Sequence, residues 1–566
     1  MEEGSFDAEG NWYRSVRILI VNCAFPRDPA VESGGGGTVV AYELAKKLVA
    51  KGHQIAVFTS HNLASIAPYA VEEYALSGIA VTTVNVPEGS DPLSDENFYN
   101  PRINEAFARV VSAHSPDVVH FHSLQGIGLS VIPVAKALGA ATIVTSHDWW
   151  WLCPYHFLCR PTGSICADSE GLVTLESCDC AGSQCLRRRR EVAATVAPHV
   201  DLFLTPSEYA RSSLIGLGLA TPERIAVNPN GIDLDQREAS TGTHEPLTFG
   251  YLGGLNTVKG YKVLLDAFTS LDLEHTRQAR LVMYGMLPAR ATGDGLSASI
   301  WSSGETGLVG KFRAKAKADP ALALRVTCNY ILRRAHLLAS TRMAKYRPAG
   351  SRVDNIDLRP PFGIIERDDV FSELDVVVVP SLVRETFSLV AREALLRGTP
   401  VVATRCGGLE EVVKDRVNGI LVNAGSVVEL KSAIEELIKS QSLVRQLREG
   451  ASATSIPSLD EQISQLEKHY DTLCKASLQQ PLAAAVPAAQ PSFGRTRHIA
   501  GQRHTHVSRE DGFGFYLNDF FLYCLLDRPN TCAQRVAEIM YGSESVSYSN
   551  AQEILTSLRL INERPC

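Results

Sequence analysis

Hydrophobic positions in the first 235 residues fall into short continuous runs separated by longer amphipathic segments. The segment 38–52 has its apolar residues at helical spacing and closes on a glycine. The apolar runs occupy residues 17–22, 53–59, 79–86, 116–122, 141–147, 201–207 and 224–230. Continuous apolar strands with helices between them indicate a parallel sheet that is covered on both faces.

A second series of the same kind begins at residue 247. Its apolar runs are 247–254, 280–285, 355–363, 374–381, 399–408 and 419–425, and helical segments lie at 258–268, 388–398 and 427–440. Two successive doubly wound units fit this order better than one very large sheet. The sequence therefore predicts an α/β protein with two Rossmann-like domains, over residues 14–235 and 236–475.

Three segments interrupt or follow this alternation. Residues 288–355 form no clean strand and carry many Lys and Arg, so we expect a basic insert. It is either a solvated surface or a docking face for an anionic acceptor or a membrane surface. Residues 476–506 are rich in Ala, Pro, Gln and His and are typical of a linker. Residues 507–566 are predicted to form a small unit of three short helices.

Charge and hydropathy exclude several classes of protein. The chain of 566 residues has 55 basic and 62 acidic side chains, so its net charge of −7 gives no general reason to expect nucleic acid. Its first residues are acidic and polar, unlike a secretory signal. No apolar run approaches the roughly 18 residues that a membrane helix needs. We therefore expect a cytoplasmic protein.

The strongest chemical pattern follows the apolar run 374–381. Glu385 and Glu393 stand eight residues apart where a strand leads into a helix, which on a continuous helix separates them by about 12 Å. That is wider than the roughly 5–9.5 Å between the acid and base of a glycoside hydrolase. The spacing suits an extended ligand instead, with the amides of Phe387, Ser388 and Leu389 at a positive helix end that favours a diphosphate. The alternative is a solvated helix face.

A second pattern lies at the start of the second domain. The strand at 247–251 runs into Gly253 and Gly254, and Lys259 stands near the start of the next helix. A lysine in this position can neutralise the charge that develops on a departing diphosphate. The alternative is an exposed lysine at the beginning of a helix.

The first domain offers a glycine-rich loop and a histidine. Gly35 and Gly36 precede a helix, but more than ten residues separate them from the strand at 17–22, which argues against a dinucleotide-binding fingerprint. Such a loop still suits close approach by a phosphate or sugar, unless it is simply a flexible loop. His147 ends the run 141–147, at the edge where open sheets contact ligands. His120 and His122 end another run and are either cleft residues or structural histidines.

Six of the 13 cysteines lie between residues 153 and 185. Thiolates this close in sequence can bind zinc or an iron–sulfur cluster, although no doublet with two intervening residues occurs. The candidate ligands of a structural metal are Cys153, Cys166, Cys178, Cys180 and Cys185. Reduced thiols and disulfides are the alternatives. The preceding Trp149–Trp151 are expected to offer a flat apolar or sugar-stacking surface, at the start of a cysteine-rich insert over 149–190.

Taken in order, these motifs resemble those of glycosyltransferase family 4, a large family of retaining enzymes. The matching pieces span about residues 17–470 and include TSHDWWWLCP, PNGID, FGYLGGLNTVKG and the block VVVVPSLVRETFSLVAREALLRG. The resemblance implies the GT-B architecture, two domains facing across a cleft, with the last helix packing back on the first domain. It further implies transfer of a hexose-type sugar from a nucleotide diphosphate with retention, and no cofactor for catalysis.

The resemblance also assigns roles to individual residues. Glu393 is similar to the glutamate that holds the nucleotide ribose, and Glu385 to the one that contacts the transferred sugar. Lys259 resembles the diphosphate lysine, and His147 a histidine near the donor sugar, while the backbone of Thr386–Leu389 lines the phosphates. Gly254 stands where the family has an arginine, which leaves open whether Arg384 substitutes for it.

The C-terminal unit faintly resembles the small PqqD-like peptide-recognition domains, which implies a helical or winged-helix fold and a peptide or carrier-protein acceptor. A simple helical packing module is the alternative. For the whole chain, the alternatives to a transferase are a phosphorylase or nucleotide-sugar hydrolase on the same fold, and a scaffold that binds sugar nucleotides without turnover.

Overall fold

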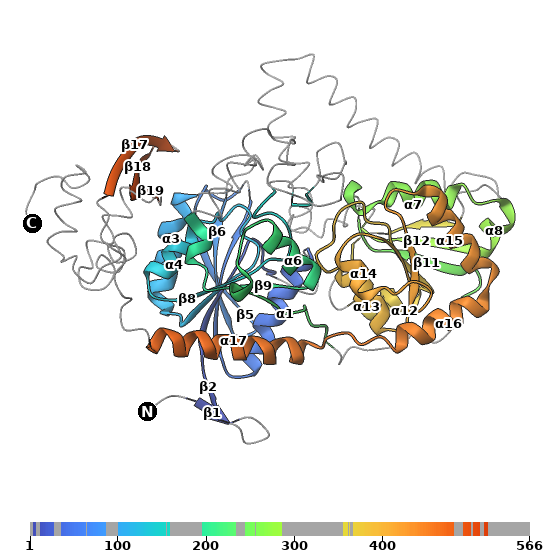
Figure 1. Cartoon of the computed structure of the whole chain (residues 1–566), viewed down its shortest axis with the longest axis horizontal. Coiled ribbons are helices and arrows are strands. Elements are labelled where there is room, and N and C mark those ends of the chain that lie inside the picture. The colour runs from blue at the N-terminus through green and yellow to red at the C-terminus, as the bar shows by residue number, and fades with distance from the viewer. Residues whose placement is uncertain are drawn as a thin grey trace, which may run out of the picture.

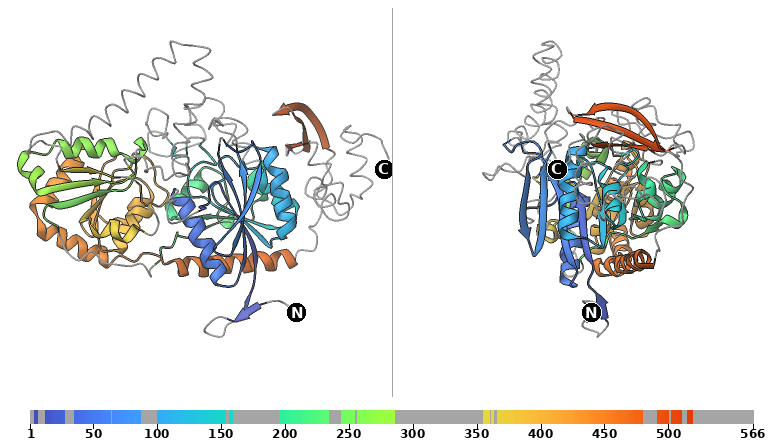
Figure 2. Two further views of the ribbon diagram at one scale, coloured as in Figure 1. Left: turned by 180° about the vertical axis from the view of Figure 1, so that it is seen from behind. Right: turned by 90° about the vertical axis from the view of Figure 1, so that its left-hand side faces the viewer.

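A computed structural model shows two α/β lobes side by side, joined by a long helix (Figures 1 and 2). It describes residues 4–6, 12–27, 35–63, 65–86, 100–153, 156–158, 195–233, 244–254, 256–285, 355–359, 361–362, 366–479, 491–499, 502–509 and 514–518. The predicted basic insert lies almost wholly outside these residues, as does most of the cysteine-rich insert.

The first lobe is built on an eight-stranded sheet with the order β10-β9-β8-β7-β3-β4-β6-β5. Its strands are β3 (Arg17–Asn22), β4 (Gln54–His61), β5 (Val71–Leu76), β6 (Ile79–Asn85), β7 (Val118–Phe121), β8 (Ala141–Thr145), β9 (Leu202–Thr205) and β10 (Ile225–Val227). All neighbours are parallel except β5 and β6. The edge strand β5 was not predicted, because its alternating polar residues lack the apolar run of a buried strand. A short antiparallel pair, β1 (Gly4–Phe6) and β2 (Trp12–Arg14), precedes the lobe.

The second lobe contains a six-stranded sheet, and every pair in it is parallel. In spatial order its strands are β13 (Ile356–Leu358), β12 (Ala279–Met283), β11 (Leu247–Tyr251), β14 (Val376–Val379), β15 (Val401–Thr404) and β16 (Gly419–Val422). The buried valine run of β14 lies near the centre of the sheet, as expected for a strand that packs on both faces.

Helices cover both faces of each sheet, so each lobe has two apolar cores. The first sheet packs between α1 (Gly36–Ala50) on one face and α3 (Pro101–His114), α4 (Val131–Ala137) and α6 (Glu208–Gly216) on the other. The second packs between α7 (Tyr261–Thr269) and α15 (Val427–Lys439) on one face and α12 (Arg367–Ser372), α13 (Leu389–Leu396) and α14 (Gly408–Val412) on the other. This is the predicted pair of doubly wound domains. The remaining helices of the second lobe are α8 (Leu273–Gln278) and α16 (Gln441–Ser452).

The helix α17 (Leu459–Gln479) leaves the second lobe and runs along the first (Figure 1). Its buried residues Ile463, Leu466 and Tyr470 belong to the same apolar core as α1. Polar contacts reinforce this packing, because Lys51 forms an ion pair with Glu467 at 2.8 Å and His53 Nε2 lies 3.1 Å from the same carboxylate. The C-terminal helix is therefore part of the first lobe's core.

The segment after α17 differs from the prediction. Strands β17 (Pro491–Ile499), β18 (Gln502–Arg509) and β19 (Gly514–Asn518) form an antiparallel sheet where a linker and the start of a helix were expected. The Ala- and Pro-rich stretch before residue 491 suggested a linker, but the residues after it include Phe, Tyr, Ile, Val and two Thr, which favour strands. The two later predicted helices lie outside the described residues.

Within the part of the chain that the structure describes, no helix has both the length and the apolar character needed to cross a membrane.

The packing of α17 generates a prediction about stability. Replacing Ile463, which is 0% exposed, by Ala should lower the free energy of unfolding by about 2–5 kcal/mol, because it leaves a cavity in the core shared with α1. Lys468→Ala, on the exposed face of the same helix, should change it little. Urea denaturation of both variants measures the difference, and equal stabilities would contradict the docking of α17.

Candidate active site between the two lobes

The carboxyl edges of the two sheets meet through the loops that follow β8 and β14. The loop residue Thr386 makes contacts from both ends, since its Oγ1 donates to the carbonyl of His147 (2.6 Å) and its carbonyl accepts from Ser207 Oγ (2.5 Å). Trp149 Nε1 adds a third link by donating to the carbonyl of Arg384 (2.8 Å). These hydrogen bonds place the predicted donor loop directly against the predicted histidine.

Lys259 and Glu385 form an ion pair at this junction. Lys259 ends the 3₁₀ turn η4 (Thr257–Lys259), and the next residue, Gly260, has a positive φ of 79°. A Cβ at Gly260 would lie 1.8 Å from the carbonyl oxygen of Pro380, so only glycine allows the turn to sit this close to the end of β14. The close approach brings Lys259 Nζ to 2.7 Å from Glu385 Oε1, which also accepts from Ser381 Oγ at 2.5 Å.

Glu385 lies in a loop rather than on a helix. Its amide donates to Cys406 O (3.3 Å) and its carbonyl accepts from Gly408 N (2.7 Å). Glu385 thus forms an isolated parallel β-bridge with Gly407, beside the end of β15. The helix α13 begins four residues later, at Leu389. The expected axial separation of Glu385 and Glu393 along one helix is therefore wrong, because the chain between them turns before the helix starts.

The amino-terminal end of α13 presents unused amides. Those of Phe387, Ser388 and Leu389 donate to no acceptor among the described residues, while Ser388 Oγ caps the helix by accepting from Ala391 N. Ser388 has a positive φ of 63°, and Arg392 supports this turn from behind by donating to the carbonyl of Phe387. Burial lowers the pKa of Arg392 to about 9. A buried cation and a helix end thus lie next to the same amides.

The glycine loop of the first lobe faces this helix end. Gly35 caps α1 and Gly36 is its first residue, and a Cβ at Gly36 would lie 3.3 Å from Leu389 Cδ1. A Cβ at Gly35 would meet no atom within 4 Å. The starts of α1 and α13 therefore approach each other from opposite lobes, and both direct their positive ends toward the junction.

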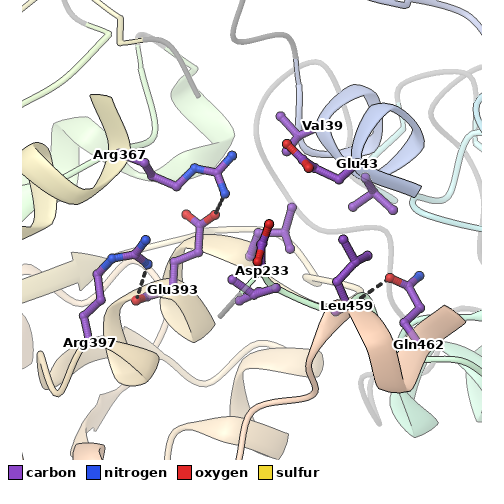
Figure 3. A pocket seen from close by; sticks show the side chains of 12 residues that line it. Val39, Glu43, Asp233, Arg367, Glu393, Arg397, Leu459 and Gln462 are labelled. Atoms are coloured by element: carbon purple, nitrogen blue, oxygen red, sulfur yellow. Dashed lines mark hydrogen bonds and ion pairs between the residues drawn. The ribbon is translucent and has the colours of Figure 1, made fainter. Parts of the chain in front are cut away.

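Glu393 lines a pocket between the lobes (Figure 3). The pocket has about 510 Å³ of space, counting the part open to solvent. Arg367 Nη1 lies 2.8 Å from Glu393 Oε1, and Arg397 donates to the Glu393 carbonyl at 3.1 Å. Glu43 and Asp233 also line the pocket, so it is lined with polar groups of both charges.

The three histidines behave differently. His120 is enclosed, with its nitrogens 2.8 Å from Tyr470 Oη and 2.7 Å from Thr145 Oγ1, which makes it a structural histidine. His147 is only half-buried, and its Nε2 lies 2.7 Å from Nδ1 of His122. Burial lowers the pKa of His147 to about 4, although the Asp148 carboxylate opposes this. His147 is therefore neutral at physiological pH.

Two further predictions from the sequence concern Gly254 and Arg384, which the sequence places near the diphosphate. Gly254 has a positive φ of 63° and accepts from Tyr251 Oη (3.0 Å), and a Cβ at Gly253 would lie 2.4 Å from the same oxygen. Both glycines therefore keep a tight turn near Tyr251. Arg384 Nη1 donates to Tyr209 Oη (3.1 Å) in the first lobe, so its side chain is engaged by the other lobe rather than by the Lys259–Glu385 pair.

The expected aromatic surface is wrong, because Trp149, Trp150 and Trp151 are each only 2% exposed and pack in the first lobe's core. Trp151 meets Phe203 edge to face, with ring centroids 5.7 Å apart. Cys153 is buried beside them, whereas Cys166, Cys178, Cys180 and Cys185 lie outside the described residues. The metal prediction for the cysteine-rich insert therefore stays a prediction.

Among the described residues, the ligand atoms of Asp272, His275 and Glu435 lie within 4.8 Å of one another and could hold a cation. Asp272 caps the start of α8, His275 lies on that helix and Glu435 on the facing α15; α8 lies at the outer end of the second lobe in Figure 1. This group is not part of the junction between the lobes.

Sequence reasoning missed several residues of the junction. Ser381 binds Glu385, Arg367 binds Glu393, and Phe157 places its ring 5.6 Å from Lys259 Nζ. Ser381 follows its strand directly and could have been suspected on that ground. Arg367 and Phe157 carry no local signal, because only the fold brings them to their partners.

The chain is similar in sequence to known glycosyltransferases. Residues 34–236 match the sequence model described as Glycosyltransferase Family 4, and residues 353–440 match that of Glycosyl transferases group 1. A D-inositol 3-phosphate glycosyltransferase of Xylanimonas cellulosilytica is 27% identical over 462 residues, covering 78% of this chain and 92% of the relative. One of Catenulispora acidiphila is 25% identical over 436 residues, covering 75% and 87%.

Solved structures share the fold. Sucrose-phosphate synthase from Thermosynechococcus elongatus superimposes with a TM-score of 0.53 at 18% identity, covering 81% of this chain and 99% of that one. HepE of Anabaena, in complex with UDP and glucose, has a TM-score of 0.51 at 17% identity, covering 81% and 100%. The two matched models fall one on each lobe, and the chain therefore belongs to glycosyltransferase family 4, with the GT-B fold of two Rossmann-like domains.

Proposed function

We propose that this protein transfers a hexose-type sugar from a nucleotide-diphosphate donor to an acceptor, with retention of the anomeric configuration. The observation that carries the proposal is the Lys259–Glu385 pair, at 2.7 Å, next to the unused amides of Phe387–Leu389. Together they offer a cation, a carboxylate and several N–H donors within one short loop. A sugar diphosphate needs this combination, because its phosphates accept hydrogen bonds and its hydroxyls donate them.

The diphosphate is assigned to the start of α13. Free amides at a helix start bind anions, and the partial positive charge of the helix end adds to the attraction. Lys259 Nζ lies within reach of the same loop and can stabilise the charge that develops as the sugar–phosphate bond breaks. The buried Arg392 contributes positive potential from behind the turn.

The nucleoside is assigned to the pocket at Glu393, one turn further along α13. The Glu393 carboxylate can accept hydrogen bonds from the ribose hydroxyls, and Arg367 holds it in place at 2.8 Å. The HepE structure was solved with UDP and glucose. UDP-glucose is therefore the first donor to test, alongside GDP-, ADP- and TDP-sugars.

Retention is assigned to transfer on one face of the sugar. Glu385 is tied to Lys259 and Ser381, and Asp148 holds the amide of Trp150 (2.8 Å), so neither carboxylate is placed as a free nucleophile. In this proposal the acceptor oxygen forms a bond to the anomeric carbon as the bond to the phosphate oxygen breaks. The acceptor proton passes to that departing oxygen. Orientation and charge stabilisation then supply the catalysis, and no cofactor is required for it.

The acceptor is assigned to the first lobe, whose loops face the donor loop. Several curated relatives are named for D-inositol 3-phosphate, which makes that compound the first acceptor to test. A glycan, peptide, carrier protein, lipid-linked or natural-product acceptor stays an alternative.

Replacing the lysine tests the diphosphate assignment. Lys259→Ala should lower the rate of UDP release from UDP-glucose by about 100- to 1,000-fold, since a preorganised charge at the leaving group is lost. Lys262→Ala, an exposed lysine one turn along, is the matched control and should retain the wild-type rate. Equal rates for the two variants would remove Lys259 from the reaction.

A binding experiment tests the nucleoside pocket separately. UDP should raise the melting temperature of the wild type, and Glu393→Gln should lose most of this shift because a neutral amide holds the ribose hydroxyls less strongly than a carboxylate. Glu410→Gln, at an exposed position on α14, should keep the full shift. A full shift in Glu393→Gln would place the nucleoside elsewhere.

The stereochemistry can be tested without the natural acceptor. Slow transfer to water from UDP-α-glucose should first yield α-glucose, which proton NMR distinguishes from the β anomer before the two equilibrate. Initial β-glucose would show inversion and refute the proposed face of attack.

A further inference from the structure

We propose that His122 is a positioning residue, which holds His147 as the neutral tautomer whose Nδ1 carries the proton and presents that N–H group to the donor sugar. The identity of the recipient rests on the proposed function. The tautomer itself follows from the packing of the two imidazoles, which are brought together by neighbouring strands.

The two histidines form one rigid unit. His122 follows β7 and His147 follows β8, and these strands are parallel neighbours. Nδ1 of His122 lies 2.7 Å from Nε2 of His147, and the ring planes are nearly parallel, 10° apart, with centroids 5.0 Å apart. The His122 amide donates to Val21 O (2.8 Å), which holds its backbone against β3. The contact is therefore built into the sheet edge rather than made by chance between mobile side chains.

Both rings are neutral, so only one of them can donate in this contact. Burial is the main cause that lowers the pKa of His147, to about 4, and it holds that of His122 well below its ordinary value. The positive end of α1 also disfavours a charged His147. Gly37 lies in the first turn of α1, and a Cβ at this position would lie only 3.7 Å from His147 Cδ2. A single shared proton therefore sits between Nδ1 of His122 and Nε2 of His147.

The other nitrogen of His122 decides which ring donates. Its Nε2 is buried and has no hydrogen-bond partner among the described residues. If His147 donated, this Nε2 would carry a buried N–H without an acceptor, which is the rarer and costlier defect in proteins. If His122 donates through Nδ1, its Nε2 is only a lone pair. The second arrangement leaves His147 Nε2 as the acceptor and puts the proton of His147 on Nδ1.

The remaining edge of His147 is the one that can meet a ligand. Its Nε2 is directed to His122 and its Cδ2 toward Gly37, whereas the residue as a whole is half-buried. Its Nδ1 makes no hydrogen bond within the described part of the chain. The carbonyl of the same residue binds Thr386, next to Glu385. The Nδ1–H group thus lies on the residue that links the two lobes, beside the proposed sugar site.

The tautomer can be measured directly in the full-length protein without substrate. Ring carbon and nitrogen shifts of isotope-labelled histidine distinguish the two neutral tautomers, and the His147→Asn spectrum identifies the His147 signals. We expect the Nδ1–H form in the wild type and a shift toward the Nε2–H form, which free imidazole rings prefer, in His122→Leu. An Nε2–H tautomer in the wild type would overturn the proposal, even if the Leu variant failed to fold.

Kinetics then tests the consequence. His122→Asn keeps an N–H donor close to the Nδ1 position and should retain kcat for UDP release from UDP-glucose within a few fold. His122→Leu should lower kcat about 100-fold with UDP binding unchanged, because the sugar loses an oriented donor. Tyr470→Phe is the matched control. It removes the hydrogen-bond partner of His120, the histidine that contacts His122 on the other side, and should leave kcat unchanged.

Equal kcat values for the Asn and Leu variants would overturn the positioning role. Absence of UDP release from the wild type would instead refute the proposed function, while the NMR result would still decide the tautomer.

Discussion

The site depends on the contact that Thr386 makes with the first lobe. Its hydroxyl group reaches the carbonyl of His147 and its carbonyl accepts from Ser207, so one loop residue is bound on both sides by loops of the other sheet. Glu385 and the free amides of α13 flank this residue directly. Their positions relative to His147 are therefore set by two short hydrogen bonds rather than by the general packing of two large domains.

Charge is distributed around this contact in a consistent way. The positive groups are Lys259, the buried Arg392 and the starts of α1 and α13, whereas the neighbouring histidines are kept neutral by burial. Each nearby carboxylate has a partner, as Glu385 has Lys259 and Glu393 has Arg367. This arrangement suits the proposed function, in which the positive groups would bind a diphosphate and the uncharged imidazoles would meet hydroxyl groups.

The long helix α17 links this chemistry to the stability of the first lobe. It leaves the second lobe, buries Ile463 and Tyr470 against α1 and the sheet, and binds His120 through the Tyr470 hydroxyl. His120 in turn contacts His122, with ring centroids 4.3 Å apart and ring planes tilted by 31°. A helix that belongs to the second domain in sequence is thus part of the first domain's core.

Several predictions from the sequence were wrong because they depend on how the chain packs in the tertiary structure. Consecutive tryptophans suggested an exposed binding surface, yet the turn after β8 directs all three into the core, where large apolar area is best buried. The Glu385–Glu393 spacing suggested one helix, but the bridge to Gly407 delays its start. The strands after residue 491 were not predicted, because the Ala- and Pro-rich stretch before them indicated a linker.

The sequence by itself determined the parallel strands of the two sheets, because continuous apolar runs between amphipathic segments have few other stable arrangements. It also pointed to Lys259, Glu385 and His147, which stand where strands end and helices start, and to Glu393 on the helix that follows Glu385. Tertiary structure alone decided their partners. The pairing of Lys259 with Glu385, of Glu393 with Arg367 and of His147 with His122 joins residues 25 or more positions apart. No local pattern records such contacts, since they arise only when the strands align and the two lobes meet.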